Sequence, residues 1–536
     1  MDHPVPNVSR SHFMPKAGIP SQATTCGYGA ESQWIAVAAT CLIVWLLMRV
    51  LFFVGIAGSD DLYVLRYAVL WDRIPVNGWE TRLLSNALTA ASIRLFGYSE
   101  LASALPSLAA SLTILVCVLA YCRRYGNVRS AWWAGLLVAV LPLDVDMATT
   151  VSSHTIMSAW MAVGTLAFLR APESKRAGYV AALCLALGVV THLAGVYYVA
   201  SLVIASLWID HRRYVIPTVT LALACVVVIA TDLAVFAIAF DDPLLRFRLS
   251  LGAMAMEHPI TPRVNGAFNP EFVLWPIRNA LYSKAFGLAL VVVLIGGWWS
   301  RRRLDPSARI LLITITLIWV WMSFGSSVPW VYRPFERIMR YLQPASLALA
   351  VLFASVVTIH RGRRLPRVVG PAVLAACVLN LLGSGTWDQN VHVSKELLAY
   401  VRGHPQMNFV TDYHTLNEMY VANGVRTIPN VATTNDIKPS RLLDSRTARL
   451  SPDEVGACDA ILVNPLNVDR TPAFKEVIRN HGDRLRYETQ TTYRRICWLA
   501  PWLRNQPWGL RKPPARVLDC APSGAPLRSE VVTDAK

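Results

Sequence analysis

Long apolar runs separated by short polar loops dominate the chain as far as residue 385. Several windows of roughly 20 residues carry almost no charge, and a helix of that length crosses the hydrocarbon core of a bilayer. We therefore predict an all-α polytopic membrane domain over residues 34–385. Its eleven predicted spans are 34–57, 101–121, 131–148, 151–169, 178–191, 193–208, 215–239, 283–299, 310–327, 341–359 and 368–385.

The spans 178–191 and 193–208 are short, and one bent element is the alternative interpretation of this pair. A single element there would reverse the orientation of everything that follows. The basic residues of the later loops argue against that reversal.

The loop 58–100 differs from the other connections. It opens with the acidic pair Asp60–Asp61 directly after an apolar run, and two amphipathic stretches follow. Helices of this kind lie at the membrane surface. Their apolar faces are Leu62, Leu65 and Val69 in the first stretch and Leu84, Leu88, Ala91 and Leu95 in the second.

Charge placement sets the orientation. With 54% hydrophobic and 16% charged residues, the chain is unlike an ordinary soluble protein. Much of its net charge of +17 sits in five short loops between spans, which indicates positive-inside topology and no nucleic-acid partner. The loops hold Arg123, Arg124, Arg129; Arg170, Lys175, Arg176; Arg212, Arg213; Arg301, Arg302, Arg303, Arg309; and Arg361, Arg363, Arg364, Arg367.

This assignment makes residues 1–33 a disordered cytoplasmic N-terminus. The loops 58–100, 240–282 and 326–340 and the C-terminal part then face the periplasm or the cell exterior. Five prolines between residues 243 and 276 predict an irregular loop over 240–282.

Charged residues return after residue 385. Short strand-like runs at 407–410, 460–463 and 494–500 and helix-like runs near 395–403 and 473–482 predict a small extramembrane α/β domain over 386–510. We expect residues 511–536 to trail off without structure.

The ten cysteines include no C-x-x-C pair, so no zinc or redox spacing is present. Three of them, Cys458, Cys497 and Cys520, lie in the outer part of the chain. Two of the three could form one disulfide. The sequence does not choose the pair.

Several short motifs, taken in order over residues 34–360, resemble the GT-C class of membrane glycosyltransferases that use lipid-linked sugars. This class includes the protein O-mannosyltransferases, the aminoarabinose transferase of lipid A and the bacterial glycosyltransferase 39/83 group. The motifs are the acidic pair after the first span, LFGYSELASALPSLAAS before the second, ATTVSSHTIMSAWMAVGTLAFLRA and RIMRYLQPASLALA.

The resemblance implies a GT-C-like fold, a location in a bacterial inner or plasma membrane, and a polyprenyl-phosphate-linked sugar donor. The acceptor would be a hydroxyl of a lipid, glycan or protein. It implies that Asp60 is the general base and that Asp61 occupies the second acidic position, since a carboxylate within reach of the hydroxyl takes its proton during attack. The structural alternative is that Ser59 or Asp60 only caps the helix that begins near Asp61.

The leaving phosphate needs cations, and arginine binds phosphate bidentately. Arg340 matches the class motif; the other outer arginines are Arg66, Arg82, Arg246, Arg248, Arg333 and Arg337, of which we favour Arg82, Arg333 and Arg337. Their alternative use is contact with lipid headgroups or helix ends.

Two positions depart from the class. His154 stands where many members carry an aspartate, and His192 where many carry a lysine. If they are functional, His192 would bind phosphate and His154 would orient the acceptor; the alternative is a structural role for each. Asp144 and Asp146 are an alternative second carboxylate at the outer mouth, or a cation site with Asp60. The sequence leaves a divalent cation open and implies no other cofactor.

Two further functions compete with the enzyme. A transporter or lipid flippase would place ionisable residues deep within the spans, whereas here they cluster at the ends. An inactive relative of the class would explain the two histidine substitutions.

Overall fold

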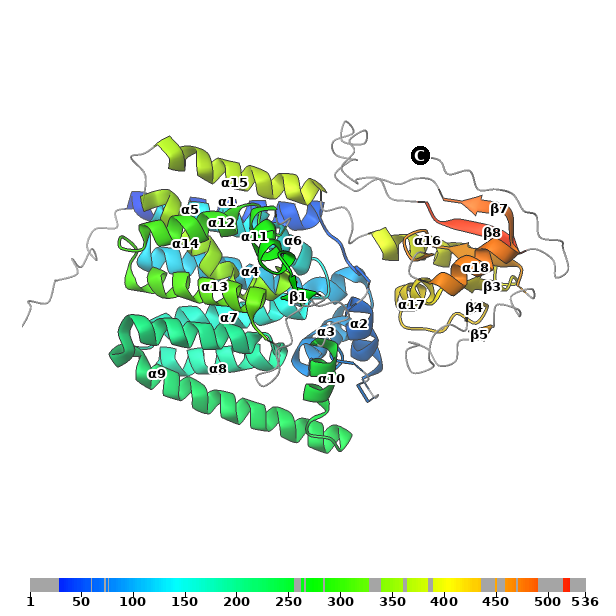
Figure 1. Ribbon diagram of the computed structural model, residues 1–536, viewed down its shortest axis with the longest axis horizontal. Coiled ribbons are helices and arrows are strands. Elements are labelled where there is room, and N and C mark those ends of the chain that lie inside the picture. Colours follow the sequence, from blue (N-terminus) through cyan, green and yellow to red (C-terminus); the bar gives the residue numbers. More distant parts are fainter. Residues whose placement is uncertain are drawn as a thin grey trace, which may run out of the picture.

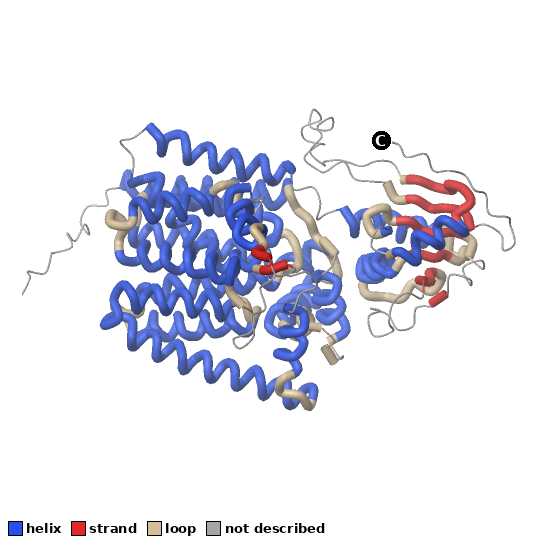
Figure 2. Tube along the Cα trace, in the orientation of Figure 1, coloured by secondary structure: helices blue, strands red, loops and turns tan. Residues whose placement is uncertain are grey.

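The computed structural model describes residues 28–58, 60–71, 74–75, 77–254, 262–264, 267–282, 285–326, 339–359, 364–383, 389–434, 449–450, 458–468, 471–489 and 514–520. A helical domain fills one side of the molecule and a small α/β domain the other (Figures 1 and 2).

The helical domain is built for a membrane. By length and apolar composition, five of the described helices qualify as spans, and the bent pair α5–α6 adds a sixth. Shorter apolar helices, such as α12, pack among them. The helices are α1 Tyr28–Leu51, α4 Glu100–Tyr125, α5 Val128–Val140, α6 Pro142–Ala148, α7 Ser153–Arg170, α8 Lys175–Thr191, α9 Gly195–Phe240, α12 Ala289–Ser300, α13 Pro306–Phe324, α14 Ser346–Ile359 and α15 Arg364–Gly383.

Several predicted spans differ from these helices at their ends. The helix of the predicted span 34–57 is shorter than predicted, since α1 ends at Leu51. Four residues later Gly55 adopts a φ of 80°, which a right-handed helix does not allow. The predicted span 131–148 is the pair α5–α6, bent by 54° at Pro142. Spans 193–208 and 215–239 are the two halves of α9, which breaks at Asp210. Helices α8 and α9 are separate and pack together, so the single bent element is excluded.

Arg49, near the end of α1, is buried inside the membrane domain and does not reach the membrane interface as arginines near helix ends often do. It donates to the carbonyls of Val138 (3.3 Å) and Ala139 (2.5 Å). Both carbonyls lack their helical partners, because Pro142 has no N–H and the N–H of Leu143 bonds to Ala285 instead. The arginine therefore fills the gap that the α5–α6 bend opens.

Short elements cover the end of the bundle that faces the α/β domain. They are α2 Asp60–Leu70, α3 Leu83–Phe96, α10 Leu245–Met254, the hairpin β1 Arg263–Val264 and β2 Ala267–Phe268, α11 Glu271–Tyr282 and the 3-10 helix η1 Met339–Ala345. The amphipathic helices predicted in 58–100 are confirmed as α2 and α3. The loop 240–282 is more regular than predicted, because Pro243 and Pro270 precede helices instead of interrupting them.

The C-terminal domain is a six-stranded mixed sheet in the order β5-β4-β3-β6-β8-β7. The strands β5, β4, β3 and β6 are parallel to one another, and β8 runs antiparallel to both of its neighbours, β6 and β7. Its elements are α16 Gln389–Gly403, β3 Phe409–Thr411, α17 Tyr413–Ala422, β4 Val431–Thr434, β5 Arg449–Leu450, β6 Ala460–Val463, α18 Pro472–His481, β7 Gly482–Glu488 and β8 Arg516–Cys520. The predicted strands at 407–410 and 460–463 correspond to β3 and β6, and the run 494–500 lies outside the described residues.

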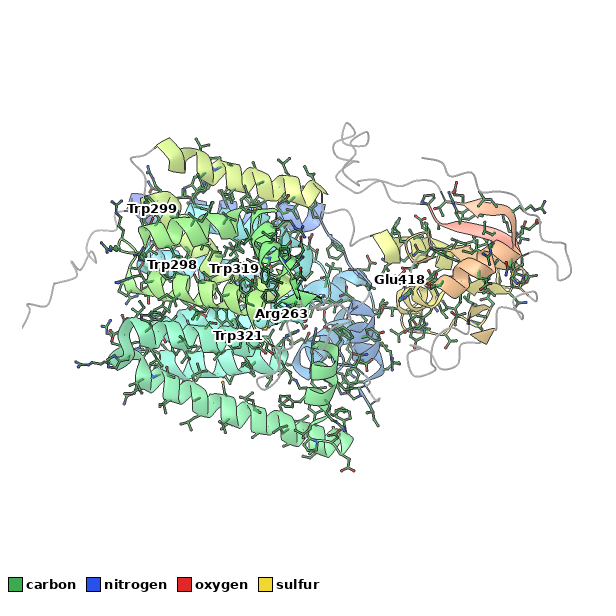
Figure 3. The ribbon with its side chains drawn as sticks, viewed as in Figure 1. Arg263, Trp298, Trp299, Trp319, Trp321 and Glu418 are labelled. Carbon is green, nitrogen blue, oxygen red and sulfur yellow. A yellow bond between two sulfur atoms is a disulfide. The ribbon has the colours of Figure 1, made fainter. Side chains whose placement is uncertain are left out.

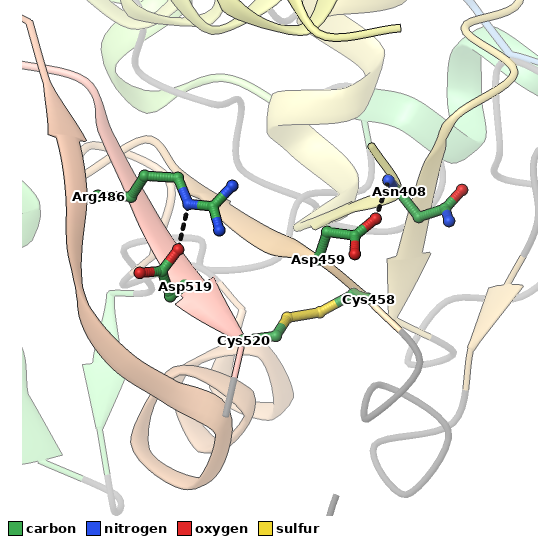
Figure 4. Close-up of a disulfide and its surroundings, with 6 residues drawn as sticks. All are labelled: Asn408, Cys458, Asp459, Arg486, Asp519 and Cys520. Carbon is green, nitrogen blue, oxygen red and sulfur yellow. Dashed lines mark hydrogen bonds and ion pairs between the residues drawn. A yellow bond between two sulfur atoms is a disulfide. The ribbon is translucent and has the colours of Figure 1, made fainter. Parts of the chain in front are cut away.

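The C-terminal strand β8 lies in the stretch 511–536 that we predicted to be unstructured, so that prediction is wrong for residues 516–520. A disulfide joins Cys458, just before β6, to Cys520 at the end of β8 (Figure 4). This pairing settles the choice that the sequence left open; Cys497 lies outside the described residues. Arg486 of β7 pairs with Asp519 beside the disulfide.

Helix α17 docks the C-terminal domain onto α2. Apolar side chains from both domains form one cluster: Ile56, Leu62, Val64, Leu65, Val151, Val391, Tyr420, Val421 and Val425. Around it, the Tyr98 hydroxyl donates to the carbonyl of Val421 (2.6 Å), and Lys395 pairs with Glu100. The two domains therefore meet at the segment that carries the acidic pair.

Candidate active site

The acidic pair begins α2 on a constrained loop. Gly55 and Gly58 both adopt left-handed φ angles, and the N–H of Gly55 donates to Thr149 at the α6–α7 junction (2.9 Å). The buried carboxylate of Asp61 accepts from the N–H of Ala57 (2.9 Å), so it closes the turn. Asp60 is the first residue of α2, and its side chain, like all of Ser59, lies outside the described residues.

Two histidines from different helices pack against each other at the same end of the bundle. His154 is the second residue of α7, and His192 is the C-cap of α8. Their ring centroids lie 4.2 Å apart with the rings tilted by 37°, and the Tyr341 ring centroid of η1 lies 5.3 Å from that of His154 and 5.9 Å from that of His192. His154 and Tyr341 lie in motifs that resemble the GT-C class, and His192 is a position that departs from it; Tyr341 itself was not singled out.

The two histidines carry buried nitrogen atoms without partners. The Nδ1 atom of His192 accepts from the N–H of Ala194 (3.1 Å), so a neutral ring carries its proton on Nε2. That Nε2 and both ring nitrogens of His154 have no hydrogen-bond partner within the described part of the chain, although both side chains are at least 97% buried. Buried polar atoms normally have partners, so these point to a ligand.

Three arginines surround the histidine pair. Arg82 donates to Ser153 Oγ (2.7 Å), beside His154. Arg82 and Arg340 act electrostatically on both histidines, and Arg246 acts on His192. Arg246 is fixed by Asp232 (2.8 Å) and by the carbonyl of Val190. The structure thus brings together four predicted site residues: Arg82, Arg340, His154 and His192. It adds Arg246, which the sequence did not favour.

The remaining outer arginines have other surroundings. Arg66 on α2 forms a buried pair with Glu80 at 3.5 Å, and the exposed Arg248 pairs with Asp242. Arg333 and Arg337 lie outside the described residues.

Asp144 is not at the outer mouth, where we expected it. It is fully buried on α6, where it accepts from Ser346 Oγ (2.9 Å) and Gln343 Nε2 (3.4 Å). Gln343 also donates to Thr155 Oγ1 (3.0 Å). Because Gln343 belongs to η1, this network fixes the element that carries Arg340 and Tyr341. Asp146 is half-buried on the same short helix.

No three His, Cys, Asp or Glu side chains gather to hold a metal ion among the described residues. This statement does not cover the side chain of Asp60, so the proposed cation site with Asp60 stays a prediction.

An apolar cavity of about 380 Å³ lies beside the first turns of α7, between α3 and α4. Leu88, Ala91 and Leu95, the predicted apolar face of α3, line it together with Ile156 and Trp160 of α7. The cavity has the character of a site for a lipid chain, and α7 connects it to the histidine pair.

Comparisons with known proteins bear on the fold. Residues 82–237 match the family model of dolichyl-phosphate-mannose-protein mannosyltransferase. No curated protein matches the chain in sequence. Among solved structures, the chain is similar to ArnT from Cupriavidus metallidurans in the apo state, with 12% identity and a TM-score of 0.56, covering 91% of this chain and 98% of that one. The same protein bound to undecaprenyl phosphate gives 13% identity and a TM-score of 0.54 over the same shares.

These matches establish the fold. The chain is a multi-pass membrane protein with the fold of the GT-C glycosyltransferases and a small C-terminal α/β domain. The family match begins at Arg82 and includes both histidines of the site.

Proposed function

We propose that the chain is an inverting glycosyltransferase that moves a sugar from a polyprenyl phosphate to an acceptor hydroxyl at the outer face of the membrane. The observation that carries this proposal is the histidine pair: three of its four buried ring nitrogens lack a partner among the described residues, and Arg82, Arg246 and Arg340 act on it electrostatically. Fixed cations and N–H donors of this kind suit a phosphate group.

In the proposed reaction, Asp60 takes the proton of the acceptor hydroxyl. The hydroxyl oxygen forms a bond to the anomeric carbon from the face opposite the phosphate, and the bond between that carbon and the phosphate oxygen breaks. Configuration is therefore inverted. The electron pair leaves with the phosphate, whose charge the three arginines and the Nε2–H of His192 stabilise.

Within this proposal, Asp61 and Asp144 act through their neighbours. Asp61 fixes the turn in front of Asp60, and Asp144 fixes η1 and with it Arg340. The prenyl chain of the donor lies in the apolar cavity between α3, α4 and α7, which begins next to the phosphate site.

One observation favours a transport function: Arg49 and Asp144 are both buried inside the membrane domain and interact electrostatically. Hydrogen bonds give each a structural role, Arg49 to the α5 carbonyls and Asp144 to Ser346 and Gln343. An unpartnered ionisable site within the bundle is what a transporter would require, and the described unpartnered histidines lie instead at its end.

Binding of undecaprenyl phosphate to the purified protein tests the phosphate site. We expect the variants Arg82→Gln and Arg340→Gln each to raise the apparent Kd by about tenfold or more, since a hydrogen bond to a charged group contributes about 1.5–3 kcal/mol. Arg248→Gln is the matched control, because this exposed arginine pairs with Asp242 away from the histidines. Equal affinity for undecaprenyl phosphate in the wild type and the three variants would show that the phosphate does not bind at this site.

A further inference from the structure

A second cavity, lined in part by arginines, lies at the end of the membrane domain opposite the candidate active site. Its volume is about 410 Å³, and it lies between α9, α12 and α13. Arg301, Arg302 and Arg309 line it, together with Trp208, Trp298 and Leu312. Figure 3 shows Trp298 and Trp299 far from Glu418, which belongs to the C-terminal domain. The cavity is therefore separate from the candidate active site.

The walls of this cavity are fixed by the chain around it. The indole Nε1 of Trp298 donates to Thr316 Oγ1 (3.0 Å), which ties the end of α12 to α13. Arg301 Nη1 donates back to the Trp298 carbonyl (3.0 Å). The break of α9 at Asp210 brings the exposed Trp208 to the same rim. A tryptophan rim of this kind is typical of the membrane–water interface.

The arginines of the cavity lack the acidic partners that other arginines at this end possess. Arg124 pairs with Glu173 at 2.9 Å and Arg123 with Glu31 at 3.9 Å. Among the residues that the structure describes, no ion pair within 4.0 Å involves Arg301, Arg302 or Arg309.

Arg309 gives the clearest sign of a missing ligand. Its Nε atom is buried and has no hydrogen-bond partner in the described part of the chain. Asp305 acts on Arg309 electrostatically, but its carboxylate accepts from the N–H of Ala308 (3.0 Å) as the cap of α13, and it does not line the cavity. An anion therefore has unused donors here.

Part of the cavity lining is apolar: Ile209, Leu312, Ile313 and Leu317 line it together with the arginines. A free inorganic anion would make no contact with these apolar side chains, whereas the acyl chain of a lipid would pack against them. Basic pockets between membrane helices with an apolar continuation suit the headgroup and chain of an anionic lipid.

We propose that this cavity is a binding site for an anionic phospholipid of the surrounding bilayer, with its phosphate on Arg301, Arg302 and Arg309 and an acyl chain along α13. The site is independent of the proposed reaction. The bound lipid would come from the bilayer leaflet on the side of the arginine loops.

The test is native mass spectrometry of the full chain in detergent with added phosphatidylglycerol or phosphatidylcholine. We expect the wild-type protein to retain phosphatidylglycerol at least tenfold more tightly than phosphatidylcholine. The triple variant Arg301→Gln/Arg302→Gln/Arg309→Gln loses this preference. The control Arg123→Gln/Arg129→Gln/Arg176→Gln removes the same number of positive charges from exposed positions of the arginine loops. It should retain the preference for phosphatidylglycerol.

Two results would overturn the proposal. One is equal retention of phosphatidylglycerol by the cavity variant and the control, with both folded by thermal unfolding. The other is complete displacement of phosphatidylglycerol by millimolar inorganic phosphate, which would show that the site recognises the free anion alone.

Discussion

At the scale of single residues, the histidine pair combines two features that seldom occur together. His154 and His192 are buried, yet three of their four ring nitrogens have no partner in the described part of the chain. Burying a polar group without a hydrogen bond is unfavourable. The arginines nearby keep the site positive, and a bound phosphate would satisfy both the nitrogens and the guanidinium groups.

His192 provides a prediction for the enzyme. His192→Phe should lower kcat/KM for the lipid-linked donor by about 10–100-fold, because an N–H donor to a charged oxygen contributes about 1.5–3 kcal/mol. His192→Gln keeps an N–H donor and should retain most of the activity. Steady-state transfer assays measure both, with His211→Phe as the control, since His211 is exposed in the turn within α9. Equal losses in the Phe and Gln variants would contradict a hydrogen-bonding role.

The sequence predicted part of this site. Arg340, His154 and His192 were found because they match or replace residues in motifs of the GT-C class, and Arg82 because it is a cation in an outer loop. Arg246 was listed among the outer arginines without preference, since its proximity to His192 depends on how α10 folds back on α8 and α9. Gln343 was overlooked, although an amide within an apolar run is a signal that could have been used.

At the scale of elements, helix breaks decide where the buried charges lie. The apolar runs predicted which segments become helices, but not the bend at Pro142, which exposes two carbonyls to Arg49. For the same reason Asp144 was placed at the surface, whereas α6 turns it inward to Gln343 and Ser346. Hydropathy measures the length of a run, and tertiary contacts decide where the helix bends within it.

The bend at Pro142 gives a stability prediction. Arg49→Leu should lower the free energy of unfolding by about 2–6 kcal/mol, because it leaves the two buried α5 carbonyls without a donor, at about 1–3 kcal/mol each. It also removes a cation that acts electrostatically on the buried Asp144. The exposed Arg123→Leu should have almost no effect. Thermal unfolding in detergent compares them. A second change, Asp144→Asn, should restore part of the loss in Arg49→Leu; no restoration would mean that the pair is not coupled.

Helix α17 gives a pH prediction, since burial raises the pKa of its N-cap, Asp412, from 3.8 to about 6. A carboxyl whose pKa is raised on folding favours the folded state most below pH 3.8, and this contribution disappears as the pH rises through 6. The difference corresponds to about 3 kcal/mol. Hydrogen exchange of the α17 amides in the intact protein should therefore quicken from pH 4 to 6, after correction for intrinsic exchange.

Asp412→Asn keeps a capping side chain but does not titrate, so its corrected exchange should be flat over that range. The same pH slope in both proteins would assign the effect to another group.

At the scale of the whole molecule, the C-terminal domain is attached to the candidate active site. Helix α17 packs on α2, directly after the acidic pair, and Tyr98 and Lys395 tie the domain to the membrane part. The sequence predicted a separate α/β domain but not this docking, because the contacts join residues far apart in the chain, such as Tyr98 and Val421, which are 323 positions apart. The basic cavity lies at the other end of the bundle, and we propose an anionic ligand for each of the two ends.

The most direct measurement of the central claim is sugar transfer by Asp60→Asn, using purified protein, a panel of polyprenyl-phosphate sugars and product analysis. Asn keeps the shape of the side chain and its capping ability but cannot take a proton at neutral pH, so transfer should fall by about 100-fold or more while binding of undecaprenyl phosphate is retained. The control Asp241→Asn, an exposed left-handed position at the end of α9, should transfer like the wild type. Full transfer by Asp60→Asn would contradict the account.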